Sequence, residues 1–533
     1  MCLADKFDKV EPSKLNKMSN SKNNKSYVNL VKTFAVTVGV AAGIVGVANP
    51  KLEVALEPVI AKTPPQRPNV VVIMADDLSK REVNVALKQG WMPNLKTRLI
   101  NKGTTFTRSF VTYSLCCPSR STFLTGQYPH NHNVLTNDFP TGGVTKLNDN
   151  STLATWLKQV GYRTGLVGKY LNGYGTNRRA NDVSDNLTYI PPGWDDWQAL
   201  AKNTNSQYSY AINDNGTVIK YGAKPNEYQT DVLAQRAVNF VNESEAINDN
   251  APFFLFITPS APHIETGSTI RSAPRHQGTA STVILPKPPS FNEPDVSDKP
   301  AWLQNEKKLS PGQIASIQKS YRRRIESLRA VDDLIGKVVA SLTSNKELNN
   351  TVLIFTSDNG YLFGEHRLTN KKVVVYEESI RVPLYIRAPG YSKRQTVSKL
   401  VLNNDLAPTI ANFAGAKTGI QVDGRSLIPL LKNPGLATWR KRFLIENFRN
   451  YQNVPPPPFC AIKTDFTDTA TPNQVYVNYS TGEQEFYDLK TDPNQLRSLH
   501  NNPARQQQIK ILQNRLAKLA VCKGQSCRTW EDK

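Results

Sequence analysis

The chain has 533 residues, of which 39% are hydrophobic and 21% are charged, and this length favours a large globular domain with a smaller one. A net charge of +22 and a pI near 9.6 indicate an anionic partner, with a basic surface kept for solubility as the alternative. No zinc finger, RNA-recognition motif or basic helix occurs in the sequence, which argues against nucleic acid as that partner.

Residues 1–48 have the features of a targeting segment. Lys22, Lys25 and Lys32 precede an apolar run at residues 34–48, which ends in the small-x-small sequence Gly46-Val47-Ala48. This run is short for a membrane span of about 20 residues. We therefore expect a cleaved signal peptide, with an uncleaved N-terminal anchor as the alternative. The protein would then be exported, to a periplasm or outside the cell, or held at the membrane if the segment stays.

Residues 49–67 have no periodicity and are interpreted as a linker. The stretch from 68 to 430, interpreted as the catalytic domain, contains short apolar runs typical of strands buried on both faces of a parallel sheet. They are residues 69–74, 162–168, 252–258 and 351–356.

Two helices are predicted among these strands, at residues 151–160, with Gly161 as the stop, and at 321–342. Alternation of helices and strands favours an α/β fold with a mostly parallel sheet. The triplet Arg322-Arg323-Arg324 is interpreted as a solvated face of the second helix. The proline-rich stretch at 272–300 is interpreted as a loop at the rim of the substrate site.

Residues 431–533 differ from the preceding stretch in their pattern of apolar and polar residues and are interpreted as a smaller α+β domain. Alternating stretches at 475–479 and 485–489 predict antiparallel strands, and residues 504–519 predict a helix. Near the end, Cys522 and Cys527 are predicted to form a disulfide, as suits an exported protein, with two reduced thiols as the alternative. No Cys/His spacing suits structural zinc.

Polar side chains directly follow the predicted strands, where ligands bind in open α/β sheets. These side chains are Asp76 and Asp77, Lys169, His263, and Asp358 with Asn359. Adjacent carboxylates repel each other and require a positive neighbour, and hard oxygen donors suit calcium or magnesium. Taken singly, an Asp-Asn-Gly sequence is usually a turn and a lone histidine is usually structural. Together they predict a metal site for an anionic ligand.

The sequence Cys116-Cys117-Pro118-Ser119-Arg120 is unusual for a core, because Pro118 removes a backbone donor and Arg120 brings a fixed cation. A buried cysteine at a helix start is the simpler alternative. The run continues through Leu124-Thr125-Gly126 to His130-Asn131-His132, and as a whole it resembles the signature of the type I sulfatases. In that family the first cysteine, here Cys116, is oxidised to formylglycine, and the hydrated aldehyde is the nucleophile.

The resemblance extends from about residue 66 to the end and implies an alkaline-phosphatase-like α/β fold. It also implies one divalent cation, with calcium ahead of magnesium, and a formylglycine-generating enzyme as partner during biosynthesis. By position, Arg120 corresponds to the residue that holds formylglycine, and Lys169, His263 and Lys372 correspond to the sulfate-handling cations. The corresponding metal ligands are Asp76, Asp77, the modified Cys116, Asp358 and Asn359.

Residues 130–134, 168–172 and 189–194 look most like the N-acetylglucosamine-6-sulfatase branch, whereas residues 364–367 look like general arylsulfatases. One position departs from the family pattern. Many arylsulfatases have a histidine two residues after the Lys169 position, a candidate base for the second step, and Leu171 stands there instead. The candidate substitutes are His130, His132 and His366.

The resemblance implies hydrolysis of an aryl sulfate or a sulfated sugar, with release of inorganic sulfate. In this hypothesis His263 protonates the leaving alcohol, and Arg120, Lys169, Lys372 and the metal stabilise charge on the sulfuryl oxygens. Two alternatives remain: a phosphonate or phosphate ester hydrolase on the same scaffold, and a catalytically silent protein that binds sulfated glycans. A binding protein would not need the modifiable Cys116.

Overall fold

A computed structural model of the chain describes residues 67–175, 186–247, 251–265, 270–448 and 455–533. The predicted targeting segment at 1–48 and nearly all of the predicted linker at 49–67 lie outside these ranges. Within the described ranges, no helix has both the length and the hydropathy that crossing a membrane requires.

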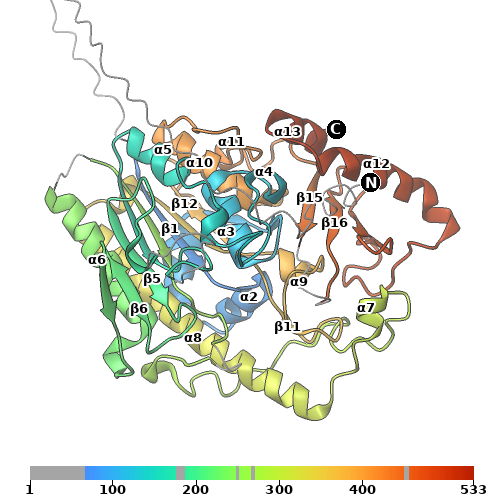
Figure 1. Cartoon of the computed structure of the whole chain (residues 1–533), viewed down its shortest axis with the longest axis horizontal. Helices are drawn as coiled ribbons and strands as arrows, with labels where there is room; N and C mark the ends of the chain where they lie inside the picture. Colours follow the sequence, from blue (N-terminus) through green and yellow to red (C-terminus); the bar gives the residue numbers. More distant parts are fainter. Residues whose placement is uncertain (1–66, 176–185, 248–250, 266–269, 449–454) are drawn as a thin grey trace, which may run out of the picture. The chain divides into compact units, whose positions relative to one another are not determined.

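A ten-stranded sheet forms the centre of the described body, with the order β13-β2-β12-β9-β1-β8-β4-β5-β6-β7 (Figure 1). Five neighbouring strands in its middle run parallel: β9 (Thr351–Ser357), β1 (Asn69–Ala75), β8 (Phe253–Thr258), β4 (Arg163–Gly168) and β5 (Asp196–Lys202). Four of them are the apolar runs predicted as buried strands, so that prediction is confirmed. The outer strands are β12 (Leu384–Arg387), β2 (Thr104–Phe106), β13 (Gln395–Val397), β6 (Ala211–Asp214) and β7 (Thr217–Lys220).

Helices cover both faces of this sheet, as alternate residues of β1 show. Val71 and Ile73 pack in one apolar cluster with α2 (Lys80–Lys88), α6 (Gln229–Ile247) and α8 (Pro311–Ser344). Val70 and Val72 pack in another with α3 (Cys116–Thr125), α5 (Leu153–Gln159), α10 (Leu406–Ala414) and α11 (Ile428–Lys432). Because both faces are buried, the central strands are continuously apolar. The predicted α/β class is confirmed.

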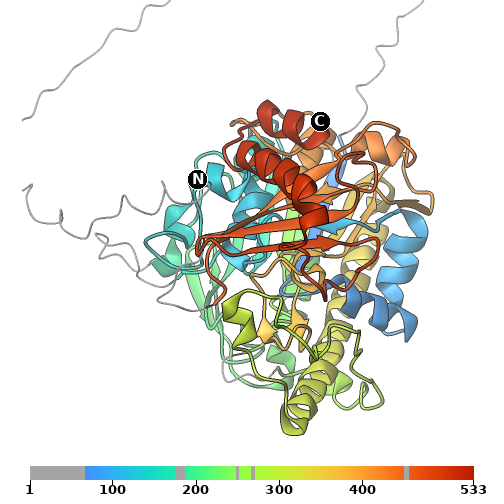
Figure 2. The same cartoon turned by 90° about the vertical axis from the view of Figure 1, so that its right-hand side faces the viewer.

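A separate antiparallel sheet follows near the C-terminus, in red and orange in Figure 2. It consists of β15 (Arg442–Asn447), β16 (Phe459–Thr464), β17 (Gln474–Tyr479) and β18 (Gln484–Asp488). Helix α12 (Gln506–Leu519) packs on it, and the disulfide between Cys522 and Cys527 links the turn after α12 to the first turn of α13 (Gln525–Asp532). The small α+β domain and the disulfide are confirmed, and the boundary at residue 430 stays a prediction.

Short elements connect these parts: β3 (Ser109–Phe110), α4 (Pro129–His132), α7 (Ala301–Gln304), β10 (Leu362–Phe363), β11 (Thr369–Lys371), α9 (Glu377–Ile380) and β14 (Val401–Leu402). The stretch at 272–300 contains one short 3-10 turn, Pro274–His276, and is otherwise irregular, as predicted.

Helix α8 begins ten residues earlier than its apolar stripe indicated. Its first turns at 311–316 are mostly exposed, so they carry no stripe, and the helix is started by Ser310 instead. The Ser310 hydroxyl accepts a hydrogen bond from the Gln313 amide, and Pro311 occupies the first turn. The solvated-face interpretation of the arginine triplet is wrong for Arg324, which is fully buried.

Candidate active site

The carboxyl ends of β1, β4, β8 and β9 lie next to one another, and polar side chains gather there. Strand β1 leads directly into Asp76 and Asp77, and β9 leads into Asp358 and Asn359. Helix α3 points its first turn, with Cys116, into the same region. The structure thus brings together all nine predicted site residues: Asp76, Asp77, Cys116, Arg120, Lys169, His263, Asp358, Asn359 and Lys372.

Asp76 is fully buried between two cations. Lys169 Nζ donates to Asp76 Oδ2 at 2.5 Å, and Arg120 Nη2 lies 3.6 Å from the same oxygen. Burial alone would raise the pKa of Asp76, but Lys169, His263 and Arg120 together hold it far below its usual range. Asp76 therefore stays ionised, and its pairing with Lys169 also raises the pKa of that lysine against the effect of burial.

Asp77 has a different set of neighbours. Its Oδ1 accepts from Lys372 Nζ and from Asn359 Nδ2, the latter at 2.6 Å. Its Oδ2 lies 3.4 Å from His263 Nε2. The other ring nitrogen of His263, Nδ1, lies 2.5 Å from the Ile264 carbonyl oxygen, which can only accept, so Nδ1 is protonated. Burial outweighs the nearby carboxylates and lowers the pKa of His263.

Cys116 is buried at the centre of these groups. Its Sγ lies 2.8 Å from Lys372 Nζ, and 3.7 and 3.9 Å from the Oδ1 atoms of Asp76 and Asp77. Burial raises the pKa of the thiol to about 12, although Lys169 and Lys372 oppose the shift. The adjacent Cys117 packs in the apolar cluster beneath the sheet face instead. Only Cys116 therefore faces the charged groups.

Arg120 connects the two carboxylate-bearing strand ends. Its Nε donates to Asp358 Oδ2 and its Nη1 to the Lys169 carbonyl, both at 2.8 Å. Asp358 Oδ1 accepts from the backbone amides of Asp77 and Asn359, at 3.0 and 2.9 Å. Burial and the charge of Asp76 raise the pKa of Asp358 to about 6, despite Arg120. Asp358 is thus the least readily ionised of the three carboxyls.

The donor set fits a divalent cation with oxygen ligands. Ligand atoms of Asp76, Asp77, Cys116 and His263 lie within 4.8 Å of one another. Asn359 Oδ1 is buried and accepts no hydrogen bond from the described residues, although a buried unsatisfied acceptor costs about 1–3 kcal/mol. An amide oxygen beside two ionised carboxylates is a good ligand for calcium or magnesium, and a bound cation would satisfy it.

Two residues of the site were not predicted. Asn205, in the loop between β5 and β6, accepts a hydrogen bond from Lys169 Nζ at 3.0 Å through Oδ1. Ser119 donates from its hydroxyl to the Asp358 carbonyl and so ties α3 to the end of β9. Ser119 lies inside the cysteine motif and could have been singled out. Asn205 carries no sequence pattern that marks it.

The structure does not bring the three substitute histidines to this cluster. Each ring is engaged elsewhere: His130 with Glu446 and the Cys522 carbonyl, His132 with Thr122, and His366 with Glu293. Leu171 packs in the apolar cluster that contains Cys117. The interpretation of these histidines as bases is therefore not supported.

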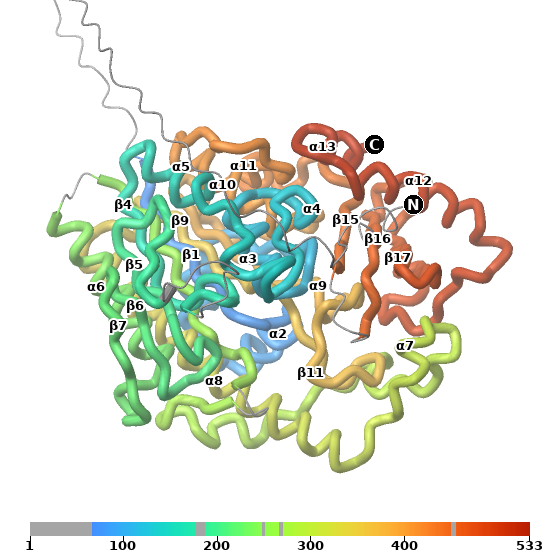
Figure 3. Tube along the Cα trace, viewed as in Figure 1, coloured from blue at the N-terminus to red at the C-terminus, as the bar shows by residue number. Residues whose placement is uncertain are grey.

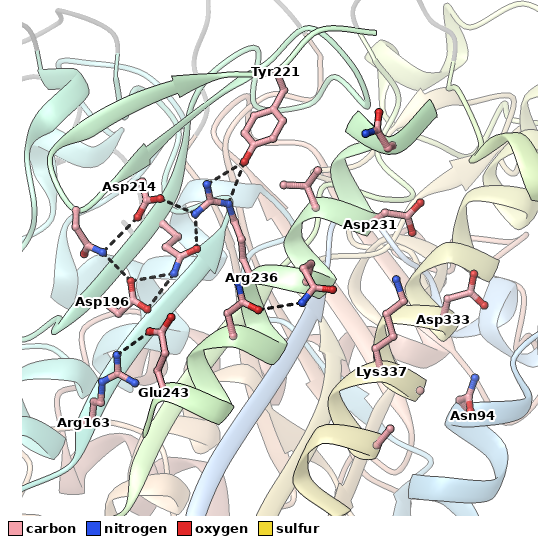
Figure 4. Close-up of a pocket in the computed structure, with 18 of the residues that line it drawn as sticks. Asn94, Arg163, Asp196, Asp214, Tyr221, Asp231, Arg236, Glu243, Asp333 and Lys337 are labelled. Carbon is pink, nitrogen blue, oxygen red and sulfur yellow. Dashed lines mark hydrogen bonds and ion pairs between the residues drawn. The ribbon is translucent and has the colours of Figure 1, made fainter. Parts of the chain in front are cut away.

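A hollow of about 1200 Å³ lies apart from these residues, between β5, β6 and the helices α6 and α8 (Figure 4). Its arginines are paired with carboxylates, Arg236 with Asp214 at 2.8 Å and Arg163 with Glu243 at 3.4 Å. None of the nine predicted site residues lines it, so it is not the candidate active site.

Comparison with known proteins identifies the family. The sulfatase family profile matches residues 68–416, and the profile of the N-sulphoglucosamine sulphohydrolase C-terminal region matches residues 364–522. N-acetylglucosamine-6-sulfatase of Capra hircus is 34% identical over 501 residues, which cover 87% of this chain and 85% of that protein. Arylsulfatase of Volvox carteri is 34% identical over 515 residues, which cover 87% of this chain and 76% of that protein.

Solved structures agree on the fold. A structure in complex with its substrate D-glucosamine-2-N,6-O-disulfate has a TM-score of 0.69 at 24% identity, covering 87% of this chain and 99% of that one. A phosphonate monoester hydrolase from Silicibacter pomeroyi has a TM-score of 0.66 at 21% identity, covering 84% and 94%. The alkaline-phosphatase-like fold is confirmed, and with the profile match it follows that this chain belongs to the sulfatase family of sulfuric ester hydrolases.

Proposed function

We propose that the protein removes sulfate from a sulfated sugar, using formylglycine made from Cys116 and one divalent cation. The observation that carries this proposal is the surroundings of Cys116, whose Sγ lies 2.8 Å from Lys372 Nζ and within 4 Å of Asp76 and Asp77. A thiol with a pKa near 12 is a poor nucleophile at neutral pH, so this position suits a modified residue better than a reactive cysteine.

The charge balance supports an anionic substrate. The three carboxylates of Asp76, Asp77 and Asp358 lie among three fixed cations, those of Arg120, Lys169 and Lys372. A bound divalent cation would therefore leave the site positive. A sulfate ester brings a compensating negative charge, and preorganised positive groups favour the charge that develops on its oxygens.

The proposed roles follow from these positions. Formylglycine at position 116 would supply an aldehyde whose hydrate provides the attacking hydroxyl. The cation, held by Asp76, Asp77, Asp358 and Asn359, would favour deprotonation of that hydroxyl and draw charge from the sulfate. Lys169 and Lys372, close to Cys116, bind sulfuryl oxygens, and Arg120 orients residue 116. His263, the most exposed of these groups, would protonate the leaving alcohol through Nε2 when its ring carries a proton on both nitrogens.

The substrate class rests on the relatives. Those from Capra hircus, Homo sapiens and Bos taurus that are 34–35% identical to this chain are N-acetylglucosamine-6-sulfatases. A sulfated amino sugar is therefore proposed ahead of an aryl sulfate. The phosphonate alternative is not favoured, because its support is a likeness of fold at 20–21% identity.

The remaining expectations are part of the same proposal. Calcium is favoured over magnesium, because calcium accepts a variable set of carboxylate and amide oxygens, whereas magnesium demands a near-octahedral arrangement. Export is supported by the disulfide between Cys522 and Cys527, which needs an oxidising compartment. A formylglycine-generating enzyme would act on the chain before Cys116 is buried.

The test is a set of assays on protein produced with a formylglycine-generating enzyme. We expect turnover of N-acetylglucosamine 6-sulfate and of nitrophenyl sulfate, little turnover of an aryl phosphonate, and loss of turnover on chelation that calcium restores. Mass spectrometry of the peptide with Cys116 and Cys117 should show formylglycine at position 116 only. Two intact thiols in fully active protein would contradict the mechanism, and preferred phosphonate turnover would contradict the substrate class.

A further inference from the structure

Arg324, on helix α8, is a buried arginine with no contact to solvent. Its guanidinium donates four hydrogen bonds to three neighbours. Nη1 donates to the Pro262 carbonyl at 2.8 Å and Nη2 to the Asp77 carbonyl. Nε and Nη2 donate to the two carboxylate oxygens of Glu82, at 2.8 and 3.1 Å. All of these acceptors lie far from α8 in the sequence.

The two carbonyls belong to the loops that carry the proposed chemistry. Asp77 is a proposed cation ligand at the end of β1, and Pro262 precedes His263 after β8. The side chains of Asp77 and His263 approach each other, with His263 Nε2 3.4 Å from Asp77 Oδ2. One guanidinium therefore touches both loops where they converge.

The backbone of Asp77 needs such support. Its φ is 61°, in the left-handed region that residues with a β-carbon rarely adopt. Strained conformations of this kind persist where the surroundings fix them, and they occur often at functional sites. Here the Asp77 amide donates to Asp358 and the Asp77 carbonyl accepts from Arg324, so both of its peptide groups are held.

We propose that Arg324 is a positioning residue that fixes the Asp77 loop relative to the His263 loop. It sets the direction of the Asp77 carboxylate toward the cation and the place of the His263 ring at the leaving group. This inference rests on the proposed function of those two residues. Arg324 itself touches no reacting atom.

The chemistry of the side chain explains why an arginine stands here. Its planar fork has five donors and donates to four acceptor atoms at once, which the ammonium group of a lysine, with three donors, cannot do. Glu82 neutralises its charge, and the rings of Tyr361 and Phe363 lie 4.6 and 5.1 Å from the guanidinium carbon. Glu82 is itself fixed by the capping box with Ser79 at the start of α2.

The experiment compares Arg324→Lys with Arg323→Lys, the same substitution one residue earlier on α8, at a half-exposed position for which no contact to Asp77 or His263 occurs among the described residues. Both proteins are produced with the formylglycine-generating enzyme. Three quantities are measured: Tm, the Kd for calcium by titration of metal-depleted protein, and kcat/KM on nitrophenyl sulfate and on N-acetylglucosamine 6-sulfate.

Arg324→Lys is expected to weaken calcium binding by about 10- to 100-fold, the usual effect of losing a residue that orients a metal ligand. It should also lose more kcat/KM on the sugar sulfate than on the aryl sulfate, because the sugar needs the proton from His263 more. Arg323→Lys should match the wild type in all three quantities. A lower Tm with unchanged calcium affinity and an unchanged substrate ratio would assign Arg324 a structural role only and overturn the inference.

Glu82→Gln provides a second variant in case no Arg324 variant folds. This variant keeps the Arg324 guanidinium but weakens its ion pair with residue 82. We therefore expect a smaller loss of calcium affinity and a smaller loss of kcat/KM on the sugar sulfate relative to the aryl sulfate. If Glu82→Gln lowered Tm but left the calcium Kd and the ratio of kcat/KM values for the two substrates at wild-type values, the inference would be overturned. Failure of the wild type to bind calcium or turn over sulfate esters would instead contradict the proposed function, so the two outcomes are distinct.

Discussion

Two buried clusters of charged side chains lie close to the cysteine motif. They differ in whether every oxygen acceptor has a hydrogen-bond donor. The active-site cluster contains the nine residues around Cys116. The anchor cluster joins Tyr128, just after the motif, to the C-terminal part of the chain; its other members are Asp405, Arg425, Arg440 and Glu531.

In the anchor cluster every carboxylate oxygen has a directed donor. Both oxygens of Asp405 accept from Arg440, at 2.6 and 2.7 Å. Glu531 accepts from Tyr128 at 2.6 Å through Oε1, and from Arg440 and Arg425 at 2.8 Å through Oε2. One donor of the anchor cluster, Arg425 Nε, has no hydrogen-bond partner among the described residues. In the active-site cluster, by contrast, an acceptor is also left over: Asn359 Oδ1 and Arg120 Nη2 both have no hydrogen-bond partner among the described residues.

The difference separates a structural ion network from a functional one. Buried carboxylates whose oxygens all accept hydrogen bonds need no further ligand, and breaking one pair leaves its partner uncompensated. A buried acceptor that is left unsatisfied beside ionised carboxylates, such as Asn359 Oδ1, can be satisfied by a bound cation. The anchor cluster is therefore expected to govern stability, and the active-site cluster is expected to govern turnover.

The sharpest test of this separation is Cys116→Ala. Turnover should fall by about a millionfold, as when the nucleophile of a catalytic unit is removed, while Tm stays near the wild-type value. The matched variant is Cys117→Ala, in the apolar cluster, which should cost about 1 kcal/mol of stability and keep turnover per folded molecule. Activity and thermal unfolding of both variants give the comparison. Turnover in Cys116→Ala well above the uncatalysed background would contradict the assignment of turnover to the active-site cluster.

The opposite pattern is expected for Arg440→Met. This change leaves Asp405 and Glu531 buried without their main partner, which should cost about 3–5 kcal/mol of unfolding free energy. Turnover per folded molecule should stay within a small factor of the wild type. Urea unfolding and activity normalised to folded protein measure the two effects. A large loss of normalised kcat with little loss of stability would show that the two clusters are not separate.

Within the active-site cluster, His263 and Lys372 should respond differently to the substrate. Lys372→Ala should slow a nitrophenyl sulfate and a sulfated sugar alike, by roughly a hundred- to thousandfold, because both present the same sulfuryl oxygens. His263→Ala should retain much more activity on the nitrophenyl ester, whose phenolate leaves without a proton. The ratio of kcat/KM values for the two esters is the measurement. Equal losses in the His263 variant would leave it a sulfate ligand.

The smallest effect concerns His130, beside the anchor cluster. Its two ring nitrogens lie 2.8 Å from Glu446 and 2.8 Å from the Cys522 carbonyl, so both donate only when the ring is protonated. Burial would lower the pKa of His130, but Glu446 outweighs it and the pKa is raised. The folded state thus binds the proton more tightly than the unfolded state, whose histidine titrates near 6.5.

The stabilisation from His130 is therefore complete below pH 6.5 and is lost as the pH rises through the folded pKa. His130→Gln should lower stability at pH 6 by about 1 kcal/mol, the usual net contribution of one hydrogen bond, and the difference from the wild type should shrink above neutrality. Tm measured for both proteins between pH 5.5 and 8.5 checks this. A difference that grows with pH would show that the ring is neutral in the folded protein.

The active-site cluster could largely be predicted from sequence, because its residues directly follow apolar strands or lie inside a contiguous motif. Asn205 could not, since it reaches Lys169 from a loop without periodicity. Helix α13 was missed because it has only eight residues and buries only Cys527 and Glu531, which are too few positions to define an apolar stripe. The anchor cluster includes Glu531 of that helix, so the hydrogen bonds that complete this cluster could not be predicted from the sequence either.

Arg324 is the instructive case. Three consecutive arginines look alike in the sequence, and only the helical phase distinguishes them. Extending the buried stripe back through Ile317 and Tyr321 places Arg324 on the same face as Leu328. Arg324 lies four residues before Leu328, inside the predicted helix at 321–342, so the phase was available from the sequence, and the charge of the side chain led to the solvated-face interpretation.

The contact between Tyr128 and Glu531 has a consequence for the order of events during synthesis. The two residues are 403 positions apart, and the segment at 522–532 lies against α4 (Figure 3). A growing chain therefore exposes the cysteine motif long before the residues that fix its far side exist. During that interval Cys116, later almost inaccessible, is open to a modifying enzyme. Residues 525–532 are synthesised late and complete the packing around Tyr128, at the far end of the motif. Slower synthesis should therefore lengthen the interval before the motif is fully packed and raise the fraction of modified molecules.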